Sequence, residues 1–168
     1  MSRPVPTPAF LFSHLSHLLA LGFGAGLSRW APGTVGTLWA WASYLLIDAL
    51  WAPGDLAWGL LIAGGLGLGW WASTATARRC GIQDPGFIVI DEIVAFWAVL
   101  WLVMPTNLLG QAVAFALFRY FDAAKPGPVG WADQAFKGEG WRGGWGIMFD
   151  DLVAAGCTVG VVAAWRFW

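Results

Sequence analysis

Two pairs of adjacent acidic residues border apolar segments of this 168-residue sequence. Asp91-Glu92 precedes one apolar run, Asp150-Asp151 precedes another, and Asp122 follows a third. One such pair at a helix start is also explained by capping and by the helix dipole, which favour acids in a first turn. Five acids gathered at one face of a membrane would repel one another unless a cation neutralised them. Because carboxylate oxygens are the ligands that Mg²⁺ prefers, the pattern predicts a Mg²⁺ site.

Basic residues are interleaved with these acids. Arg119, Asp122 and Lys125 are three residues apart, so they lie near one another on a helix, which Pro126 and Pro128 then end. One interpretation is a helical salt bridge that contributes only a few tenths of a kcal/mol. The interpretation favoured by a position next to the membrane is that Arg119 and Lys125 bind phosphate oxygens while Asp122 binds the metal.

Two glycine-rich segments could bring backbone N–H groups to an anion. Residues 31–37 include Thr34, Gly36 and Thr37 and precede an apolar run, where a loop and a helix N-terminus could bind phosphate. An ordinary turn with an N-cap has the same composition. Residues 143–146 precede the second acidic pair and would let the backbone approach a ligand, with a plain loop as the alternative.

Other catalytic motifs are missing from the sequence. It contains no GxSxG elbow, P-loop, HExxH helix or cysteine-based phosphatase loop. His14 and His17 have no acid nearby and are interpreted as surface groups, and Cys80 and Cys157 as free thiols. These absences leave metal-assisted attack on phosphorus.

Composition indicates lipid as the solvent of this chain. Hydrophobic residues make up 58% of it and charged residues only 11%, against roughly 25% charged residues in soluble domains. A net charge of −1 gives no basic field for nucleic acid. We expect no cleaved signal at residues 1–8. Polar and apolar residues alternate with helical spacing over residues 9–23, which predicts a helix lying along the membrane interface.

Four or five apolar runs follow and predict an all-α, multi-pass membrane protein. They span residues 38–52, 56–72, 93–104, 108–118 and 152–168. A bilayer core requires about 20 helical residues, so the third and fourth runs must recruit flanking residues, tilt, or form a hairpin that does not fully cross.

The loops between these runs differ in charge. Loops 52–55 and 105–107 contain no Lys or Arg and should face outward. Nearly all basic residues fall in the alternating segments, which the positive-inside rule assigns to the cytoplasm: Arg29, Arg78, Arg79, Arg119, Lys125, Lys137 and Arg142. The acidic residues of the predicted site lie on this same side, so we expect an active site that faces the cytoplasm.

Together these motifs resemble the phosphatidylglycerophosphatase A family. The matching segments are residues 31–37, 84–92, 118–128 and 143–151, in order and spacing, within about residues 24–156. The resemblance implies a single domain over residues 1–168, in the inner membrane of a bacterium. It implies a Mg²⁺-dependent enzyme that removes the terminal phosphate of phosphatidylglycerophosphate to give phosphatidylglycerol. The chain departs from the family pattern at Ala95, where a glycine is usual, and in extra residues around 139–142, which could alter a substrate-facing loop beside Asp133.

These observations lead to one set of expected site residues. The expected catalytic and metal-binding residues are Asp91, Glu92, Asp122, Asp150 and Asp151. The expected phosphate-binding residues are Arg119, Lys125, Thr34, Gly36 and Thr37. The attacking group is either a water molecule activated by the metal or an Asp carboxylate, and the sequence leaves both open.

Two alternative functions remain at this point. A non-enzymatic cation-binding or carrier protein would carry charge deep within its apolar runs, whereas most acids here lie at their ends. A lipid phosphatase with another headgroup preference would share every catalytic residue. The glycines within residues 59–69 allow close helix packing either within a monomer or between protomers.

Overall fold

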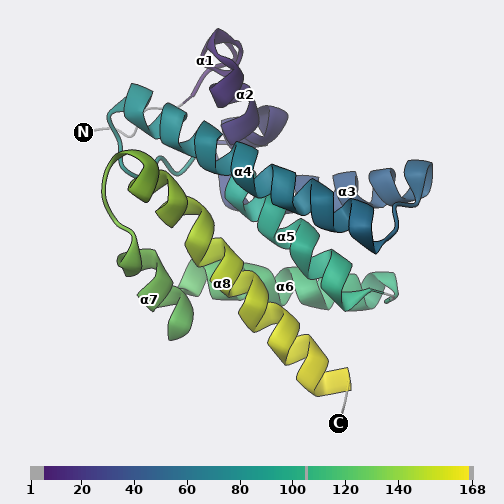
Figure 1. Cartoon of the computed structure of the whole chain (residues 1–168). Coiled ribbons are helices and arrows are strands. Elements are labelled where there is room, and N and C mark those ends of the chain that lie inside the picture. The colour runs from purple at the N-terminus through teal and green to yellow at the C-terminus, as the bar shows by residue number, and fades with distance from the viewer. Residues whose placement is uncertain (1–5, 105, 167–168) are drawn as a thin grey trace.

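The structure is a computed structural model that describes residues 6–104 and 106–166, and all regular elements in these ranges are helices (Figure 1). In order they are α1 (Pro8–Ser13), α2 (Leu15–Ala20), the 3₁₀ helix η1 (Gly22–Leu27), α3 (Pro32–Trp51), α4 (Asp55–Cys80), α5 (Ile90–Val103), α6 (Leu108–Ala124), α7 (Pro128–Ala135) and α8 (Gly140–Arg166). The expected all-α class is confirmed. Residues 1–5, where no cleaved signal was expected, and residues 167–168, which end the last apolar run, lie outside the described residues.

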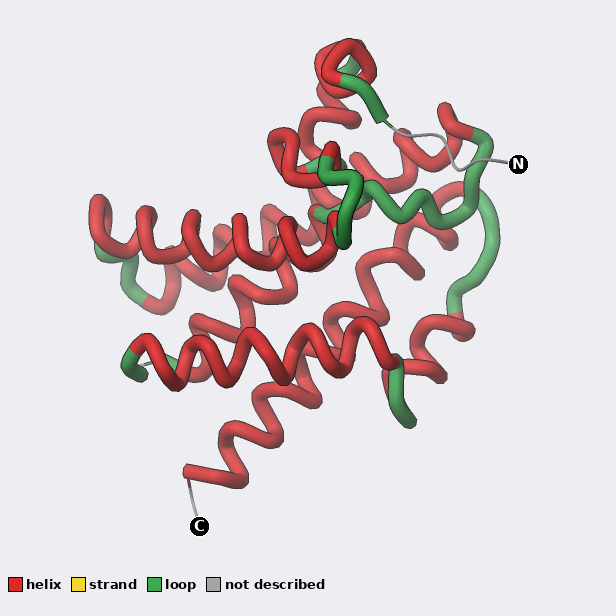
Figure 2. Tube along the Cα trace, turned by 180° about the vertical axis from the view of Figure 1, so that it is seen from behind, coloured by secondary structure: helices red, strands yellow, loops and turns green. Residues whose placement is uncertain are grey.

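Helices α5 and α8 form the centre of the bundle. Helix α8 packs against α4, α5, α6 and α7, and α5 packs also against α3, α4 and α6. The core between them contains Phe96 and Leu100 from α5, Phe118 from α6 and Ala154 from α8, all fully buried. Both views place the α3–α4 connection at the same end of the bundle as the start of α6 (Figures 1 and 2). Neither connection contains Lys or Arg.

Within the part of the chain that the structure describes, two helices are long and apolar enough to cross a membrane. They are α4, with 26 residues, and α8, with 27 residues. Only 28% and 39% of their most apolar windows are buried within the protein. The core helix of a water-soluble protein would be mostly buried, so exposed residues such as Leu60 and Leu68 on α4 indicate contact with lipid. Helices α5 and α6 are shorter, as their apolar runs predicted.

The N-terminal segment differs from the single interfacial helix that was expected. His14 has an extended backbone and separates α1 from α2. Ser16 and His17, predicted to form an exposed polar face, are buried. Nδ1 of His17 lies 3.1 Å from the Phe10 carbonyl oxygen, and the Arg79 guanidinium donates to Ser16 Oγ at 3.0 Å. Ser16 and one ring nitrogen of His17 therefore find partners inside the protein, whereas His17 Nε2 is buried without one among the described residues.

Both glycine-rich segments are helical rather than loops. Residues 33–37 form the first turns of α3, and residues 143–146 lie within α8. A Cβ at Gly36 would lie 2.8 Å from Val89 Cβ, and a Cβ at Gly144 would overlap Thr74 Oγ1. These glycines allow close packing between helices. Glycine suits a turn equally well, so its presence in the sequence was compatible with either structure.

We expect Gly144→Ala to lower the free energy of unfolding by about 1–3 kcal/mol, as overpacking in a close contact does. The added methyl group would also lie 3.0 Å from the Thr74 Cα, which is backbone and cannot rotate away. Gly156→Ala on the same helix is the matched control, since no atom lies within 4 Å of a Cβ there. Unfolding measured in detergent should show destabilisation at position 144 alone, and equal effects at both positions would refute this contact.

Candidate active site

A short turn fixes the start of α5. The Ile88 N–H donates to the Pro85 carbonyl at 2.9 Å, and the Val89 N–H donates to the Ala20 carbonyl at 2.8 Å. Val89 is fully buried and is the N-cap residue of α5. These contacts anchor the helix start against α2 and place Asp91 and Glu92 in its first turn, as the sequence predicted.

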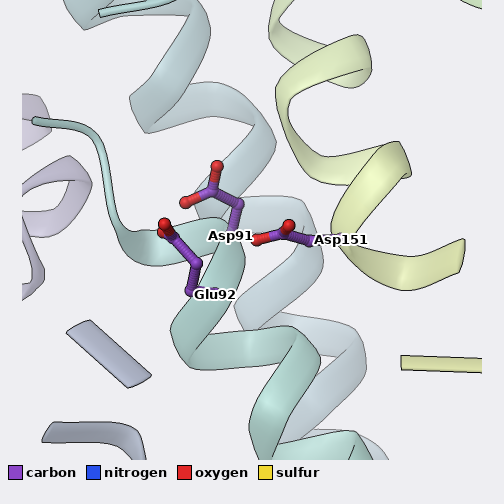
Figure 3. Close-up of side chains that lie close together, drawn as sticks. All are labelled: Asp91, Glu92 and Asp151. Carbon is purple, nitrogen blue, oxygen red and sulfur yellow. The ribbon is translucent and has the colours of Figure 1, made fainter. Parts of the chain in front are cut away.

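Three carboxylates converge between α5 and α8. Asp91, Glu92 and Asp151 each offer one oxygen, and these oxygens lie within 4.8 Å of one another. Figure 3 shows the Asp151 side chain directed from α8 toward the two acids of α5. We call these three residues the carboxylate triad.

The triad fits a hard divalent cation. Asp91 Oδ1, Glu92 Oε2 and Asp151 Oδ2 are buried and have no hydrogen-bond partner within residues 6–104 and 106–166. Buried carboxylate oxygens without partners are costly, and like charges at this separation add to the cost. A cation of the Mg²⁺ or Ca²⁺ type, which prefers carboxylate oxygens, would remove both penalties.

The second acidic pair lies deeper in its helix than expected. The sequence placed Asp150 and Asp151 at a helix start, whereas α8 begins at Gly140, ten residues before Asp150. The favourable interaction with a helix N-terminus is confined to the first turn. Capping and the helix dipole, which were the alternative to cation binding, therefore do not explain this pair.

Arg119 connects three helices beside the triad. Its guanidinium forms an ion pair with Asp122 on α6, lies 3.8 Å from Glu92 Oε1 on α5, and donates to Thr37 Oγ1 on α3 at 3.5 Å. Its side chain is only 19% exposed. A Cβ at Gly33 would overlap Glu92 Oε1 and lie 3.1 Å from the guanidinium. Gly33 is thus required for this close approach of α3.

Lys125 lies at the end of α6, where proline was predicted to stop the helix. It is the C-cap residue and has a left-handed backbone with φ of 46°. Its ammonium group bonds Asp133 and lies 2.6 Å from Asp150 Oδ2. Burial opposes the charged form, but the hydrogen bonds that Lys125 donates to Asp133 and Asp150 outweigh it and raise the pKa of Lys125. Lys125 therefore stays positively charged at neutral pH.

A cavity of about 310 Å³ joins these groups. The predicted residues that line it are Asp91, Glu92, Asp122, Lys125, Asp150 and Asp151. Asp84, Asp133 and Lys137 line it as well, although they were not among the expected site residues. Lys137 Nζ lies 3.0 Å from Asp133 Oδ2, and burial raises the pKa of Asp84. The Asp84-Pro85 segment, which matched the family pattern, was the available signal for Asp84.

The remaining predicted phosphate-binding residues have other contacts. The Thr37 hydroxyl donates to the Gly33 carbonyl at 2.8 Å and accepts from Arg119, and its side chain is fully buried. Arg119, Thr34, Gly36 and Thr37 are not among the residues that line the cavity. Their contact with phosphate stays a prediction, and the α3 residues would make it from a helix instead of a loop.

Comparison with known proteins agrees with the family resemblance of the sequence motifs. The sequence profile of the family described as Phosphatidylglycerophosphatase A matches residues 18–166. The phosphatidylglycerophosphatase A of Escherichia coli is 39% identical over 147 residues, which is 87% of this chain and 80% of that protein. The protein of the same name in Haemophilus influenzae is 38% identical over 152 residues, covering 90% of this chain and 89% of that protein.

A third relative carries a different name. A protein of Bacteroides thetaiotaomicron, provisionally named phosphatidylinositol-3-phosphatase, is 36% identical over 165 residues, which is 92% of this chain and 96% of that protein. No solved structure matches the chain.

Proposed function

Because this chain belongs to the phosphatidylglycerophosphatase A family and is a membrane-bound phosphatase, we propose that it hydrolyses phosphatidylglycerophosphate to phosphatidylglycerol and phosphate. We propose also that Mg²⁺ is its cofactor. The observation that carries the cofactor proposal is the carboxylate triad, whose three carboxylates lie close together at the wall of the cavity and each have one buried oxygen without a partner among the described residues.

The proposed ligands of Mg²⁺ are the triad residues Asp91, Glu92 and Asp151. When bound there, the ion would supply positive charge to the phosphoryl oxygens and would favour attack on phosphorus. Asp122 and Asp150 line the same cavity, but each is paired with a basic residue. In this proposal they orient Arg119 and Lys125 and add negative charge around the ion.

The basic residues have the complementary role. Lys125 and Lys137 line the cavity and share Asp133 as a partner, so both ammonium groups are held near the space that a phosphate group would enter. An ammonium group that donates to phosphate oxygens stabilises charge that develops there. Arg119 does not line the cavity and would fix the position of Glu92 through their ion pair.

The position of the site suits a lipid substrate. The triad and Lys125 line the cavity together with Gln83, which lies three residues after the end of α4. The last turn of α4 carries Arg78 and Arg79. By the positive-inside rule this end faces the cytoplasm of a bacterial inner membrane. The acyl chains would stay in the bilayer while the headgroup reaches the cavity, so the lipid need not leave the membrane.

The relative named for phosphatidylinositol 3-phosphate supports a second candidate substrate. We expect kcat/KM for phosphatidylglycerophosphate to exceed that for phosphatidylinositol 3-phosphate by roughly tenfold or more, since the bulkier inositol and its hydroxyl groups need partners inside the cavity. Phosphate release from each lipid, in mixed micelles at matched surface concentration, gives the ratio. A ratio below one would reassign the headgroup and leave the catalytic proposal standing.

A further inference from the structure

A second concavity lies beside the connection between α6 and α7. It is a groove of about 420 Å³ between that connection and α8. Phe121, Pro126 and Pro128 line one side, and Cys157, Gly160 and Val161 of α8 line the other. None of the described residues that line the groove carries a charge. The chemistry of these walls suits a hydrocarbon ligand.

The groove begins where the catalytic cavity ends. Asp122 and Lys125 line the cavity, and their chain neighbours Phe121 and Pro126 line the groove. On α8 the corresponding residues are Asp150 and Cys157, which are seven residues, or about two turns, apart and so lie on the same face of the helix, about 10 Å apart along its axis. The groove therefore leads from the phosphate site along the apolar part of a helix long enough to cross a membrane.

We propose that this groove binds one acyl chain of the phospholipid substrate, an inference that rests on the proposed function. A lipid whose terminal phosphate lies at the triad must direct its chains toward the hydrophobic part of the bundle. Inside a bilayer the surrounding lipid is as apolar as the groove. Selective binding of an acyl chain therefore depends on shape and van der Waals contact rather than on apolar character alone. The groove between the Pro126–Pro128 turn and α8 provides such a shape, and the space beside Gly160 is open to a ligand.

A second copy of the protein is the rival occupant. Gly156, Gly160 and Ala164 recur every four residues, a spacing typical of helix–helix contacts in membranes. Gly160 and Ala164 line the groove, however, and the Pro126–Pro128 turn forms its opposite wall. A trough with two walls that opens next to the phosphate site fits a single chain better than a whole helix.

The test is Gly160→Leu, with Ala164→Leu as a second variant further along the groove. Leucine at either position would fill space that the chain occupies. Loss of about two methylene contacts should lower kcat/KM for dihexadecanoyl phosphatidylglycerophosphate roughly tenfold. Turnover of the deacylated headgroup, glycerophosphoglycerol phosphate, should not change. Gly67→Leu on α4 is the matched control, because it also adds a side chain in open space and lines neither cavity.

The two substrates separate the possible outcomes. Selective loss on the acylated lipid in both groove variants supports the inference. Unchanged turnover of the lipid in both variants, an equal loss on both substrates, or dissociation of an oligomer by Gly160→Leu in size-exclusion chromatography would overturn it. If the wild-type protein releases phosphate from neither substrate, the proposed function itself has failed.

Discussion

Asp151→Asn is expected to lower kcat by at least about 10³-fold, because metal-assisted phosphoryl transfer loses several kcal/mol of charge stabilisation with a ligand. Asp91→Asn should have the same effect. Asparagine has nearly the same size, so helix packing is retained and only one negative charge of the triad is lost. Asp48→Asn, at the far end of α3, is the matched control and should leave kcat unchanged. Phosphate release from phosphatidylglycerophosphate measures all three variants.

Thermal unfolding gives a second readout of the same variants. In the presence of a chelator, Asp151→Asn should be at least as stable as the wild type, since it removes a like charge from a buried cluster. Added Mg²⁺ should raise the Tm of the wild type more than that of the variant, because binding to the folded state stabilises it. Near-normal kcat in either triad variant would remove that residue from the proposed metal site.

Gly33→Ala is expected to lower kcat by about 10²-fold, the cost of displacing catalytic groups by about 1 Å. The added methyl group would overlap Glu92 Oε1 and press on the Arg119 guanidinium, so both side chains must move. The substitution changes no charge and removes no donor. A loss of activity would therefore arise from position alone.

Gly64→Ala on α4 is the control for Gly33→Ala, since no atom lies within 4 Å of a Cβ there. It should leave kcat unchanged, and alanine should slightly favour the helix. Circular dichroism and Tm show whether the variants remain folded. A folded Gly33→Ala protein with wild-type kcat would show that the observed arrangement of Glu92 and Arg119 is not needed for turnover.

Local chemistry made part of the site predictable from sequence. Asp91 and Glu92 stand next to an apolar run, and a helix start there follows from the change in hydropathy. The end of α6 was predictable because proline cannot continue a helix, and Lys125 is indeed its C-cap residue. The ion pair of Arg119 with Asp122 follows from their three-residue spacing.

Features that depend on distant partners could not be predicted. Glycine in residues 33–37 and 143–146 is compatible with a loop or with close helix packing, and only the positions of Val89 and Thr74 decide between them. Helix α8 begins at Gly140 and includes the glycines of residues 143–146. The hydropathy pattern placed the helix start at the second acidic pair, which is too late in the sequence. The correction strengthens the cation interpretation of Asp151, since this residue lies eleven residues after the start of its own helix.

Dependence on partners outside the local sequence also explains the residues whose contacts were not predicted. Asp133 meets Lys125 only because α7 folds back after the Pro126–Pro128 turn. The buried position of His17 depends on contacts with Phe10 and with its own turn, whereas its spacing indicated an exposed face. Neither contact leaves a periodic signal in the sequence.

The dependence of phosphate release on Mg²⁺ tests the proposed mechanism most directly. Purified protein in detergent micelles would be stripped with a chelator, supplied with phosphatidylglycerophosphate, and titrated with Mg²⁺ while released phosphate is measured. We predict no release before Mg²⁺ is added and a saturable recovery as it is added. Full release by the stripped protein in the continued presence of chelator would contradict a catalytic role for a cation at the carboxylate triad.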